Sequence, residues 1–570
     1  METIKKSIPG CKISVATIKR WCIRLSLLGL CIDPGLVSAG GASNSDIRDF
    51  QASWVGKALE YQRKLQLDVP FVGANIIGTH NSYNSSAYDY AFPNQDTKIN
   101  KQLNMGARII DFDLHYYKTA LESTKKIRLC HAQSVGVCSR FDRLFKDGLK
   151  EVRDWLRDNP NTVLIINLEN HIDSQKGYSK ARSILRDVLE NYIYRSEGCS
   201  EFPSNITPRQ ILAAGKQVIV TMGRGCTGHD DLDKRIFHSL STKLKKLSED
   251  ASTFGGGFDI SESEIADGFS GENGPTYQLV KLDFMDVRPN KSRTRVDAGI
   301  WSWRSNRPNN RFDNDHCAHS DMSKDPDQWG GTWEDSPCDN VKRFACRVVG
   351  TKGPNATWVF PSASGRWDQG ESVCNSVTGR NLAFGMPMNS VEQKRLRKAQ
   401  QNDGNAARVW LNYTDQAYEG NWFVPPTTQF ITVSLRSYHD KYVTVKDNGG
   451  DELTNTKTTA GEKETFIMFE TDKETRDGCL QHDEKVALMT TDGFYFSAQS
   501  DDTMEANRAK LAGWETFTLG TTGGGSCVGD SSEIYLKTAH NKYVKAERKG
   551  AINAEATNRQ NWELFVVETH

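Results

Sequence analysis

The sequence has no long apolar run and no excess of charge of one sign. No stretch approaches the ~18 consecutive apolar residues that a membrane-spanning helix needs, and the mean hydropathy is -0.59. Lys plus Arg and Asp plus Glu both number 72, so the formal net charge is zero. This balance argues against a nucleic-acid-binding surface and a polybasic membrane arm. We therefore expect no nucleic-acid partner, and any membrane contact should be peripheral.

The 13 cysteines include no CxxC pair of the kind that binds metals. Residues 1–39 have the features of a secretory signal peptide, because basic residues precede the apolar run "LSLLGLCI" and the small-residue stretch "GLVSA". Removal of this segment takes away three cysteines and leaves ten, an even number that suits five disulfides in an exported protein. Asn-x-Ser/Thr sequons fit the same route. We expect a secreted, extracellular protein; the alternative is a disordered basic leader on a cytosolic one.

At 570 residues the chain exceeds what one hydrophobic core supports, so three or four domains are expected. Short apolar runs such as "ARIIDFDL", "TVLIINLE" and "KQVIVTMG" alternate with amphipathic stretches across residues 60–297. Apolar strands separated by helices predict a parallel sheet covered on both faces. The number of strands favours a closed TIM-type (β/α) barrel, with an open doubly wound sheet as the competing architecture.

The composition changes after this region. Residues 298–425 are rich in Trp, Asn, Cys and Gly and have little helical pattern, which predicts one or two small disulfide-rich modules. Residues 429–570 contain three repeats in which a leucine precedes a tyrosine by seven positions: Leu435 and Tyr442, Leu488 and Tyr495, Leu536 and Tyr543. Three β-rich units that cannot bury a face alone can do so around a pseudo-threefold axis, so the repeat predicts an all-β trefoil.

Polar residues of a few types follow the predicted strands of the first region. In a parallel barrel the carboxyl ends of the strands share one face, where active sites are built. The residues that we expect to meet there are His80, Asn81, Asp111, Asp113, His131, Glu169 and Asp283.

The types of these residues indicate a chemistry. Asp111 and Asp113 are two positions apart, so their carboxylates lie on the same side of a strand, where they would repel each other unless a cation joins them. Carboxylate and amide oxygens are the ligands that Ca²⁺ prefers. Histidines can serve as acid, base or charge stabiliser.

The motifs "GTHNSY", "GARIIDFD", "LCHA" and "IINLENH", in this order, resemble the catalytic X region of phosphatidylinositol-specific phospholipase C, and "LENH" resembles its calcium-dependent form. The resemblance implies a catalytic pair, His80 and His131, with Asp283 orienting the first. It also implies Ca²⁺ as cofactor, with the ligands Asn81, Asp111, Asp113 and Glu169. An arginine replaces Asp113 in the metal-independent bacterial members, so Asp113 favours the calcium form.

The implied reaction is cleavage of phosphatidylinositol, or a glycosylated derivative, to diacylglycerol and a cyclic inositol phosphate at a membrane surface. Members of that family that prefer polyphosphorylated inositides have lysines in the strand after the glutamate. Here that strand is apolar beyond Lys216, so the resemblance disfavours such substrates. Lys216 and Arg224 are the candidate substrate contacts. The alternatives are a barrel phosphodiesterase of the glycerophosphodiester type and a non-catalytic secreted lectin-like adhesin.

The later regions have resemblances of their own. "WSW", "TWEDSPC" and "FACR" resemble the second half of C-type lectin-like domains, which implies the pairs Cys317 with Cys338 and Cys346 with Cys374. The tripeptide that binds sugars in that family is not evident. The last region resembles fascin-type trefoils more than ricin-type lectins. A carbohydrate or cell-surface ligand for these regions stays open, because fold likeness does not establish binding.

Overall fold

The structure is a computed structural model. It describes residues 41–90, 93–131, 138–223, 226–238, 240, 244, 246–248, 260–271, 274–288, 293–324, 331–446, 452–472, 479–523 and 527–570. The predicted signal peptide, residues 1–39, lies outside the described residues.

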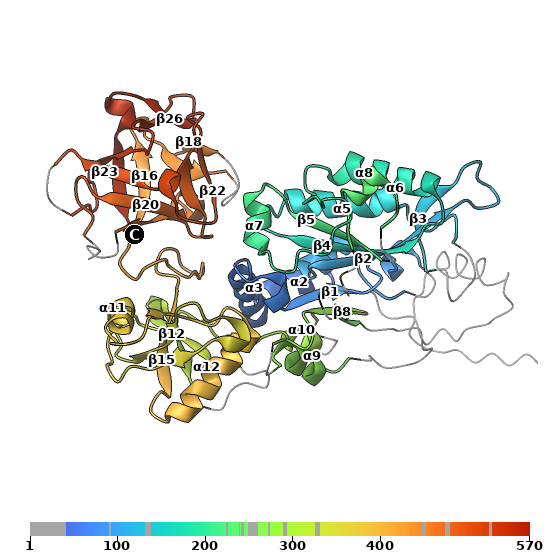
Figure 1. The fold of residues 1–570 in the computed structure, drawn as a ribbon, viewed down its shortest axis with the longest axis horizontal. Coiled ribbons are helices and arrows are strands. Elements are labelled where there is room, and N and C mark those ends of the chain that lie inside the picture. The colour runs from blue at the N-terminus through green and yellow to red at the C-terminus, as the bar shows by residue number, and fades with distance from the viewer. Residues whose placement is uncertain are drawn as a thin grey trace, which may run out of the picture. The chain divides into compact units, whose positions relative to one another are not determined.

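A parallel sheet organises the first region (Figure 1). Its strands lie in the order β6-β5-β4-β2-β1-β8-β7 and are joined by parallel ladders. A further strand, β3 (Lys126–Leu129), pairs antiparallel with β2. The bounds of the parallel strands are β1 (Ile76–Thr79), β2 (Ile109–Tyr117), β4 (Leu164–His171), β5 (Val218–Met222), β6 (Phe237–His238), β7 (Lys246–Ser248) and β8 (Leu279–Leu282).

This pattern of strand pairing corrects the prediction of a closed TIM-type barrel. Among the described residues the path begins at β6 and ends at β7, and these two strands do not pair with each other. The sheet therefore has two edges as far as it is described. The stretch "KIRL" that forms β3 runs back along β2.

Helices cover one face of this sheet. The apolar residues of α5 (Phe145–Arg157) recur every three or four positions and are buried, and α6 (Gln175–Leu189) begins after Ser174, whose hydroxyl accepts a hydrogen bond from the Gly177 backbone N–H. Both helices lie against the sheet (Figure 1) and pack on Phe112 and Leu168. The remaining helices of the region are α2 (Asn44–Ala52), α3 (Trp54–Gln66), α4 (Ile99–Asn104), α7 (Pro208–Ala213), α8 (Asp230–Asp233), α9 (Glu262–Phe269) and α10 (Arg293–Asp297).

The other face of the sheet is apolar at its base and polar above. Ile109, Ile165, Ile219 and Leu279 form a buried cluster at the amino ends of their strands. Side chains alternate along a strand, so the next residues on this face come two positions later. These residues are polar: Asp111, Asn167, Thr221 and Lys281.

The middle region contains two small sheets. One has the order β10-β9-β15-β11 and the other β13-β12-β14. Buried tryptophans, among them Trp303 and Trp333, fill its core. Its elements are β9 (Cys317–Asp321), β10 (Trp333–Ser336), β11 (Arg343–Phe344), β12 (Cys346–Val348), β13 (Trp358–Val359), α11 (Gly370–Asn375), β14 (Leu382–Phe384), α12 (Ser390–Asp403) and β15 (Arg408–Thr414).

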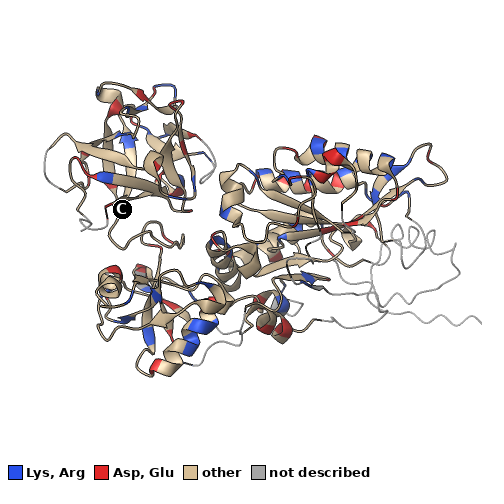
Figure 2. Ribbon diagram, viewed as in Figure 1, with Lys and Arg blue, Asp and Glu red and all other residues tan. Residues whose placement is uncertain are grey.

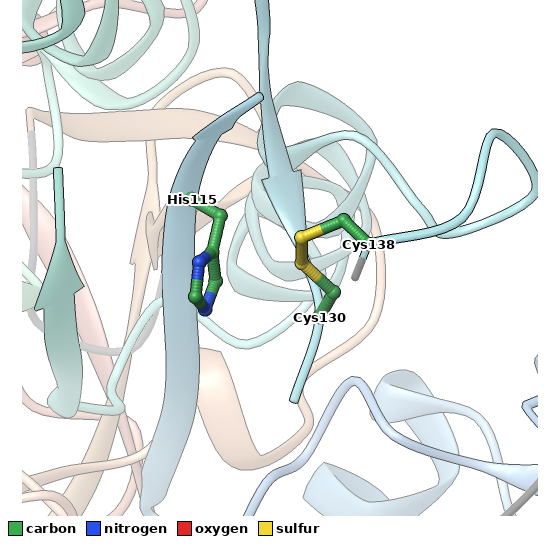
Figure 3. Close-up of side chains that lie close together, drawn as sticks. All are labelled: His115, Cys130 and Cys138. Atoms are coloured by element: carbon green, nitrogen blue, oxygen red, sulfur yellow. A yellow bond between two sulfur atoms is a disulfide. The ribbon is translucent and has the colours of Figure 1, made fainter. Parts of the chain in front are cut away.

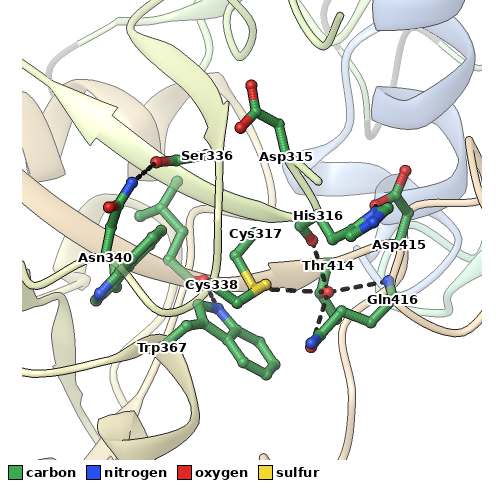
Figure 4. The surroundings of a disulfide bond; sticks show 12 residues. Asp315, His316, Cys317, Ser336, Cys338, Asn340, Trp367, Thr414, Asp415 and Gln416 are labelled. Carbon is green, nitrogen blue, oxygen red and sulfur yellow. Dashed lines mark hydrogen bonds and ion pairs between the residues drawn. A yellow bond between two sulfur atoms is a disulfide. The ribbon is translucent and has the colours of Figure 1, made fainter. Parts of the chain in front are cut away.

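Both disulfides expected in this region are present. Cys317 is bonded to Cys338 and Cys346 to Cys374. The first lies beside Thr414, whose hydroxyl donates to the His316 carbonyl at 2.7 Å (Figure 4). These bonds confirm the pairing without showing a lectin-like fold.

The last region is antiparallel. Strands β16, β19, β20, β23, β24 and β27 pair in a ring, because β27 joins both β24 and β16. Three hairpins, β17-β18, β21-β22 and β25-β26, are attached to it. The bounds are β16 (Ile431–Ser437), β17 (Tyr442–Val445), β18 (Leu453–Lys457), β19 (Phe466–Glu470), β20 (Lys485–Thr490), β21 (Tyr495–Ala498), β22 (Met504–Arg508), β23 (Phe517–Thr521), β24 (Glu533–Lys537), β25 (Tyr543–Ala546), β26 (Ile552–Ala556) and β27 (Phe565–Thr569).

The fold class expected for this last region is corrected as well. The ladders describe a closed barrel of six antiparallel strands with a disulfide between Cys479 and Cys527, in place of the predicted β-trefoil. The repeat located the strands, but the assignment of the fold from it is wrong.

Three further features concern the described part of the chain as a whole. The described residues contain five disulfides, the number expected from the ten cysteines that follow the leader. None of the described helices combines the length and the apolar character needed to cross a membrane. Positive and negative residues are mixed on α5, α6 and α8 (Figure 2).

Candidate active site

The polar face of the sheet is arranged in rows. Asp111 lies beside Asn167, Asp113 beside Glu169, and His115 beside His171, because β2 and β4 pair in this register. Asp111 and Asp113 on β2 are buried, Glu169 on β4 is exposed, and His115 and His171 of the last row are partly buried. The predicted site residues of β2 and β4 therefore share one surface.

His80 and Asp283 meet at the ends of β1 and β8. The two strands are adjacent, and the His80 backbone N–H donates to the Leu282 carbonyl at 3.1 Å. His80 Nδ1 lies 3.1 Å from Asp283 Oδ1, in hydrogen-bonding contact. Asn81 then takes a left-handed conformation, with φ of 43°, which asparagine tolerates better than most residues. The structure thus brings together the histidine and the aspartate expected to orient it.

His131 follows β3 on the same edge of β2 as His80. Strand β4 occupies the other edge of β2, so β1 and β3 share this one. Strand β1 meets β2 at Ile110 and runs parallel to it, whereas β3 meets β2 at Leu114 and runs antiparallel. The ends of β1 and β3 therefore approach each other along β2, and each is followed by one of the two predicted catalytic histidines.

Asp111 is bound by two neighbouring side chains. Its Oδ2 accepts from Lys281 Nζ and its Oδ1 accepts from Asn167 Nδ2, at 2.5 and 2.6 Å. Burial by itself raises the pKa of this carboxyl, but the Lys281 ammonium and His80 outweigh it and bring the pKa to about 2. Asp111 is therefore an ionised partner of a buried lysine.

Asp113, one row higher, has an oxygen without a partner. Its Oδ2 accepts from the Tyr83 hydroxyl at 2.9 Å, while its buried Oδ1 has no hydrogen-bond partner among the described residues. Burial, with the negative charges of Asp111 and Glu169, raises the pKa of Asp113 to about 8. The Oδ1 atom of Asn81 is likewise buried and unpartnered among the described residues. In a cation site, such oxygens lack a hydrogen-bond donor because they bind the ion instead.

Glu169 and His171 complete the polar face of the sheet. His171 Nε2 lies 3.5 Å from Glu169 Oε1, and this contact lowers the pKa of Glu169. The ring of His171 stacks on that of His115, with centroids 4.4 Å apart and planes 6° from parallel. His115 in turn lies beside the Cys130–Cys138 disulfide (Figure 3). Because both sulfurs are in that bond, this group offers no thiolate to a metal.

The calcium set expected from the sequence fits the structure in part. Asn81 and Asp113 each present an unpartnered oxygen, and the Glu169 carboxylate is half exposed. Asp111 differs, since Lys281 and Asn167 take both of its oxygens. A divalent cation could be held by Asn81, Asp113 and Glu169, whereas Asp111 would have to leave its lysine first.

The two candidate substrate contacts are placed differently. Lys216 precedes β5, at the opposite end of the sheet from His80, and its ammonium donates to the Asn191 carbonyl at 3.1 Å. The structure does not bring it to the other site residues. Arg224 lies outside the described residues, so its role stays a prediction.

Lys281 and His171 were missed by the reasoning from the sequence. Lys281 stands two residues before Asp283 in the apolar strand "LVKL", so a charged residue on the same face as the aspartate was a usable signal. His171 has the same relation to Glu169 in "LENH". Their partners on other strands could not be read from spacing.

Comparisons with known proteins support the resemblance stated for the first region. Residues 42–249 match a family model described as the Rv2075c PI-PLC-like domain. This match points to a phosphodiesterase-like function for the region that contains His80, Asp113 and Glu169. It ends at residue 249, so it gives no support to lectin-like modules or a β-trefoil.

Two relatives from Mycobacterium tuberculosis are similar to part of the chain. They are the uncharacterized proteins MT2135, of strain CDC 1551 / Oshkosh, and Rv2075c, of strain ATCC 25618 / H37Rv. Each is 25% identical over 193 residues, which cover 30% of this chain and 40% of the relative. The match thus spans less than half of the relatives' length.

Two solved structures are also similar in part. The SDF2-like protein of Arabidopsis thaliana has a TM-score of 0.21 at 9% identity, over 24% of this chain and 92% of its own. The S. cerevisiae protein O-mannosyltransferase Pmt1-Pmt2 complex bound to the sugar donor has a TM-score of 0.21 at 11% identity, over 24% of each chain. Scores this low carry no argument about the fold or function.

Proposed function

We propose that the protein is a secreted phospholipase C-like phosphodiesterase that cleaves phosphatidylinositol, or a glycosylated derivative, to diacylglycerol and a cyclic inositol phosphate. The observation that carries the proposal is the contact of His80 with Asp283 at one end of the sheet, beside the rows of Asp111 and Asp113. The PI-PLC-like match over residues 42–249 includes most of this surface. Five disulfides support export.

The roles follow from the positions. A hydrogen bond from His80 Nδ1 to Asp283 leaves Nε2 free to take a proton from the inositol 2-hydroxyl, whose oxygen attacks phosphorus within the same molecule. His131 protonates the departing diacylglycerol oxygen. A divalent cation, Ca²⁺ in the form that the resemblance implies, would be held by Asn81, Asp113 and Glu169 and would lower the pKa of that hydroxyl. Lys281 keeps Asp111 ionised below this layer.

The enzyme would reach its lipid substrate through peripheral contact with a membrane surface. The middle and last regions are proposed to supply binding to a carbohydrate or cell-surface ligand, which would hold the enzyme near its substrate. Lipid headgroup preference depends on contacts such as the predicted one with Arg224.

Release of diacylglycerol and cyclic inositol phosphate from phosphatidylinositol vesicles tests the proposal. The wild-type protein should release both, and His80→Asn and His131→Ala should each lower turnover by about 10²-fold or more, the usual contribution of an acid or base. Lys150→Ala, an exposed change on α5, should have no effect. Chelation of divalent ions should abolish turnover.

Two outcomes would contradict it. Normal turnover by His131→Ala, or by the wild type in excess chelator, would overturn the assigned mechanism. Hydrolysis of deacylated headgroups without a cyclic product would instead favour a glycerophosphodiester type of enzyme.

A further inference from the structure

We propose that Asp113, Glu169 and His171 form a metal centre of mixed oxygen and nitrogen donors, that Lys281 keeps Asp111 out of it, and that it binds Mn²⁺ in preference to Ca²⁺. The inference rests on the proposed function and deepens it at the cation site, where it puts His171 in the place of Asn81 and Mn²⁺ in the place of Ca²⁺. The resemblance implied four oxygen ligands that included Asp111 and did not include His171.

The three side chains converge from two neighbouring strands. Asp113 on β2 and Glu169 on β4 are paired in register, and His171 lies two positions beyond Glu169 on the same face. One ligand atom from each lies within 4.8 Å of the other two. A single ion can reach all three after small movements of the exposed Glu169 side chain.

The unpartnered oxygen of Asp113 is the independent sign of a ligand. Asp113 is 1% exposed, and among the described residues only its Oδ2 has a hydrogen-bond donor, the Tyr83 hydroxyl. A buried carboxylate oxygen without a partner is costly, so native proteins pair such atoms with a donor or an ion. Of the described residues in this cluster, Asp113 holds the buried oxygen that a metal would satisfy.

Asp111 is excluded by its own contacts. Lys281 is 4% exposed, and its ammonium would be buried without a partner if Asp111 turned away to bind an ion. Removing one partner of a buried ion pair is strongly unfavourable. The ammonium therefore occupies the position that a cation would take at the lower aspartate.

The histidine is held in place for ligation. Its ring is stacked on His115, and His115 lies against the Cys130–Cys138 disulfide at the end of β3 (Figure 3). Imidazole is a poor ligand for Ca²⁺, which takes oxygen, but a good one for first-row transition ions. Two carboxylates and one imidazole, with positions left open for substrate, suit Mn²⁺ better than Ca²⁺.

Two other groups of this kind have their carboxylates already satisfied. In the first, Asp415 accepts from His316 and from the Gly420 backbone, as Figure 4 shows for His316. In the second, the group of His319, the carboxylates of Asp321 and Glu334 are bonded to Arg408 and Lys324. Among the described residues, neither group has a buried carboxylate oxygen without a partner.

Binding of Mn²⁺ to the chelator-treated full chain, followed by the electron paramagnetic resonance signal of the free ion, tests the inference. The wild type should bind one Mn²⁺, and displacing it should require at least a tenfold excess of Ca²⁺. His171→Ala and Asp113→Asn should each weaken Mn²⁺ binding at least tenfold. Asp111→Asn should change it less than threefold, and so should Asp111→Asn combined with Lys281→Met, which leaves no unpaired lysine.

The variants separate this inference from the proposed function. His131→Ala should bind Mn²⁺ normally and lose lipid cleavage. Bound Mn²⁺ without cleavage by the wild type would support the metal centre and overturn the enzyme proposal. Unaltered binding by His171→Ala, equal loss in the Asp111 variants and Asp113→Asn, or displacement by equimolar Ca²⁺ would overturn the metal centre.

Discussion

At the scale of single residues, the contact of Asp283 with His80 fixes which ring nitrogen is available. The pair joins the ends of two adjacent strands, and Gln95 Nε2 donates to the carbonyls of both His80 and Leu282, so the geometry is held from several sides. A histidine held through Nδ1 presents Nε2 in one orientation. Asp283 is thus a positioning residue whose loss should change the pH profile as well as the rate.

We expect Asp283→Asn to lower kcat on phosphatidylinositol by about 10²-fold or more with KM nearly unchanged, because the amide favours the wrong tautomer of the histidine. The measurement is the pH dependence of kcat, which should shift in the variant. Asp286→Asn is the matched control, since Asp286 is bonded to Arg288 instead. Equal losses in both variants would assign Asp283 a purely structural role.

A second residue-scale prediction concerns His319 in the middle region. Burial lowers the pKa of His319 to about 3, helped by the positive charges of Lys342, Arg408 and Arg307 and opposed by Asp321. Between pH 6.5 and about 3, His319 therefore binds a proton in the unfolded chain and does not bind one in the folded chain. The free energy of unfolding should therefore fall as the pH falls, by about 1.4 kcal/mol per pH unit below 6.5.

Thermal unfolding between pH 7.5 and 4.5 measures this slope. His319→Gln should reduce this slope, whereas His482→Gln, in the last region, should leave it unchanged. An identical slope in the wild type and His319→Gln would rule out His319 as its source.

At the scale of elements, the close approach of β1 to β2 depends on Gly78. A Cβ atom at this position would lie 2.4 Å from the Cβ and 2.7 Å from the carbonyl oxygen of Ile109, shorter than atoms in contact allow. Gly78→Ala should therefore lower the free energy of unfolding by about 1–3 kcal/mol through overpacking. Urea-induced unfolding measures the loss.

The control is Gly223→Ala at the end of β5, where the nearest atom to an added Cβ is the Leu168 carbonyl oxygen at 3.8 Å. That change should be nearly neutral. Equal stability of the Gly78 variant and the wild type would mean that β1 can move away from β2.

The sequence predicted the strands themselves better than which strands lie next to one another. The alternating run that became β2 located Asp111 and Asp113 on one face, because a two-residue period survives any tertiary context. The partner of Asp111 is Lys281, 170 residues away in the sequence. The two side chains meet only because β8 pairs with β1. Local patterns carry no information about strand order, so the order of the strands in the sheet and the reversal of β3 could not be predicted.

The last region shows the same limit. The repeated leucines fall in β16, β20 and β24, and the tyrosines seven positions later begin β17, β21 and β25. The repeat therefore marks six of the twelve strands described in this region. How six strands close into a ring depends on pairings such as β16 with β27, which join the ends of the region.

At the scale of the whole molecule, the disulfides differ in the length of chain that they close. The separations range from 8 residues for Cys130–Cys138 to 48 residues for Cys479–Cys527. In the chain-entropy description, a longer closed loop restricts the unfolded chain more, which corresponds to about 2.5 kcal/mol for the shortest and about 4 kcal/mol for the longest. The last region, which holds the longest of these closed loops, should depend most on its cross-link.

Replacing Cys479 and Cys527 together with serine should therefore destabilise the protein more than replacing Cys130 and Cys138 together. The loss should be confined to the last region, because Cys479 precedes β20 and Cys527 follows β23, two strands that pair with each other. Amide hydrogen exchange of the peptides that cover β20 and β23 measures it, with the peptides of β2 and β4 as the internal control. Faster exchange in all four strands alike would contradict a local role and would mean that the regions unfold as one cooperative unit.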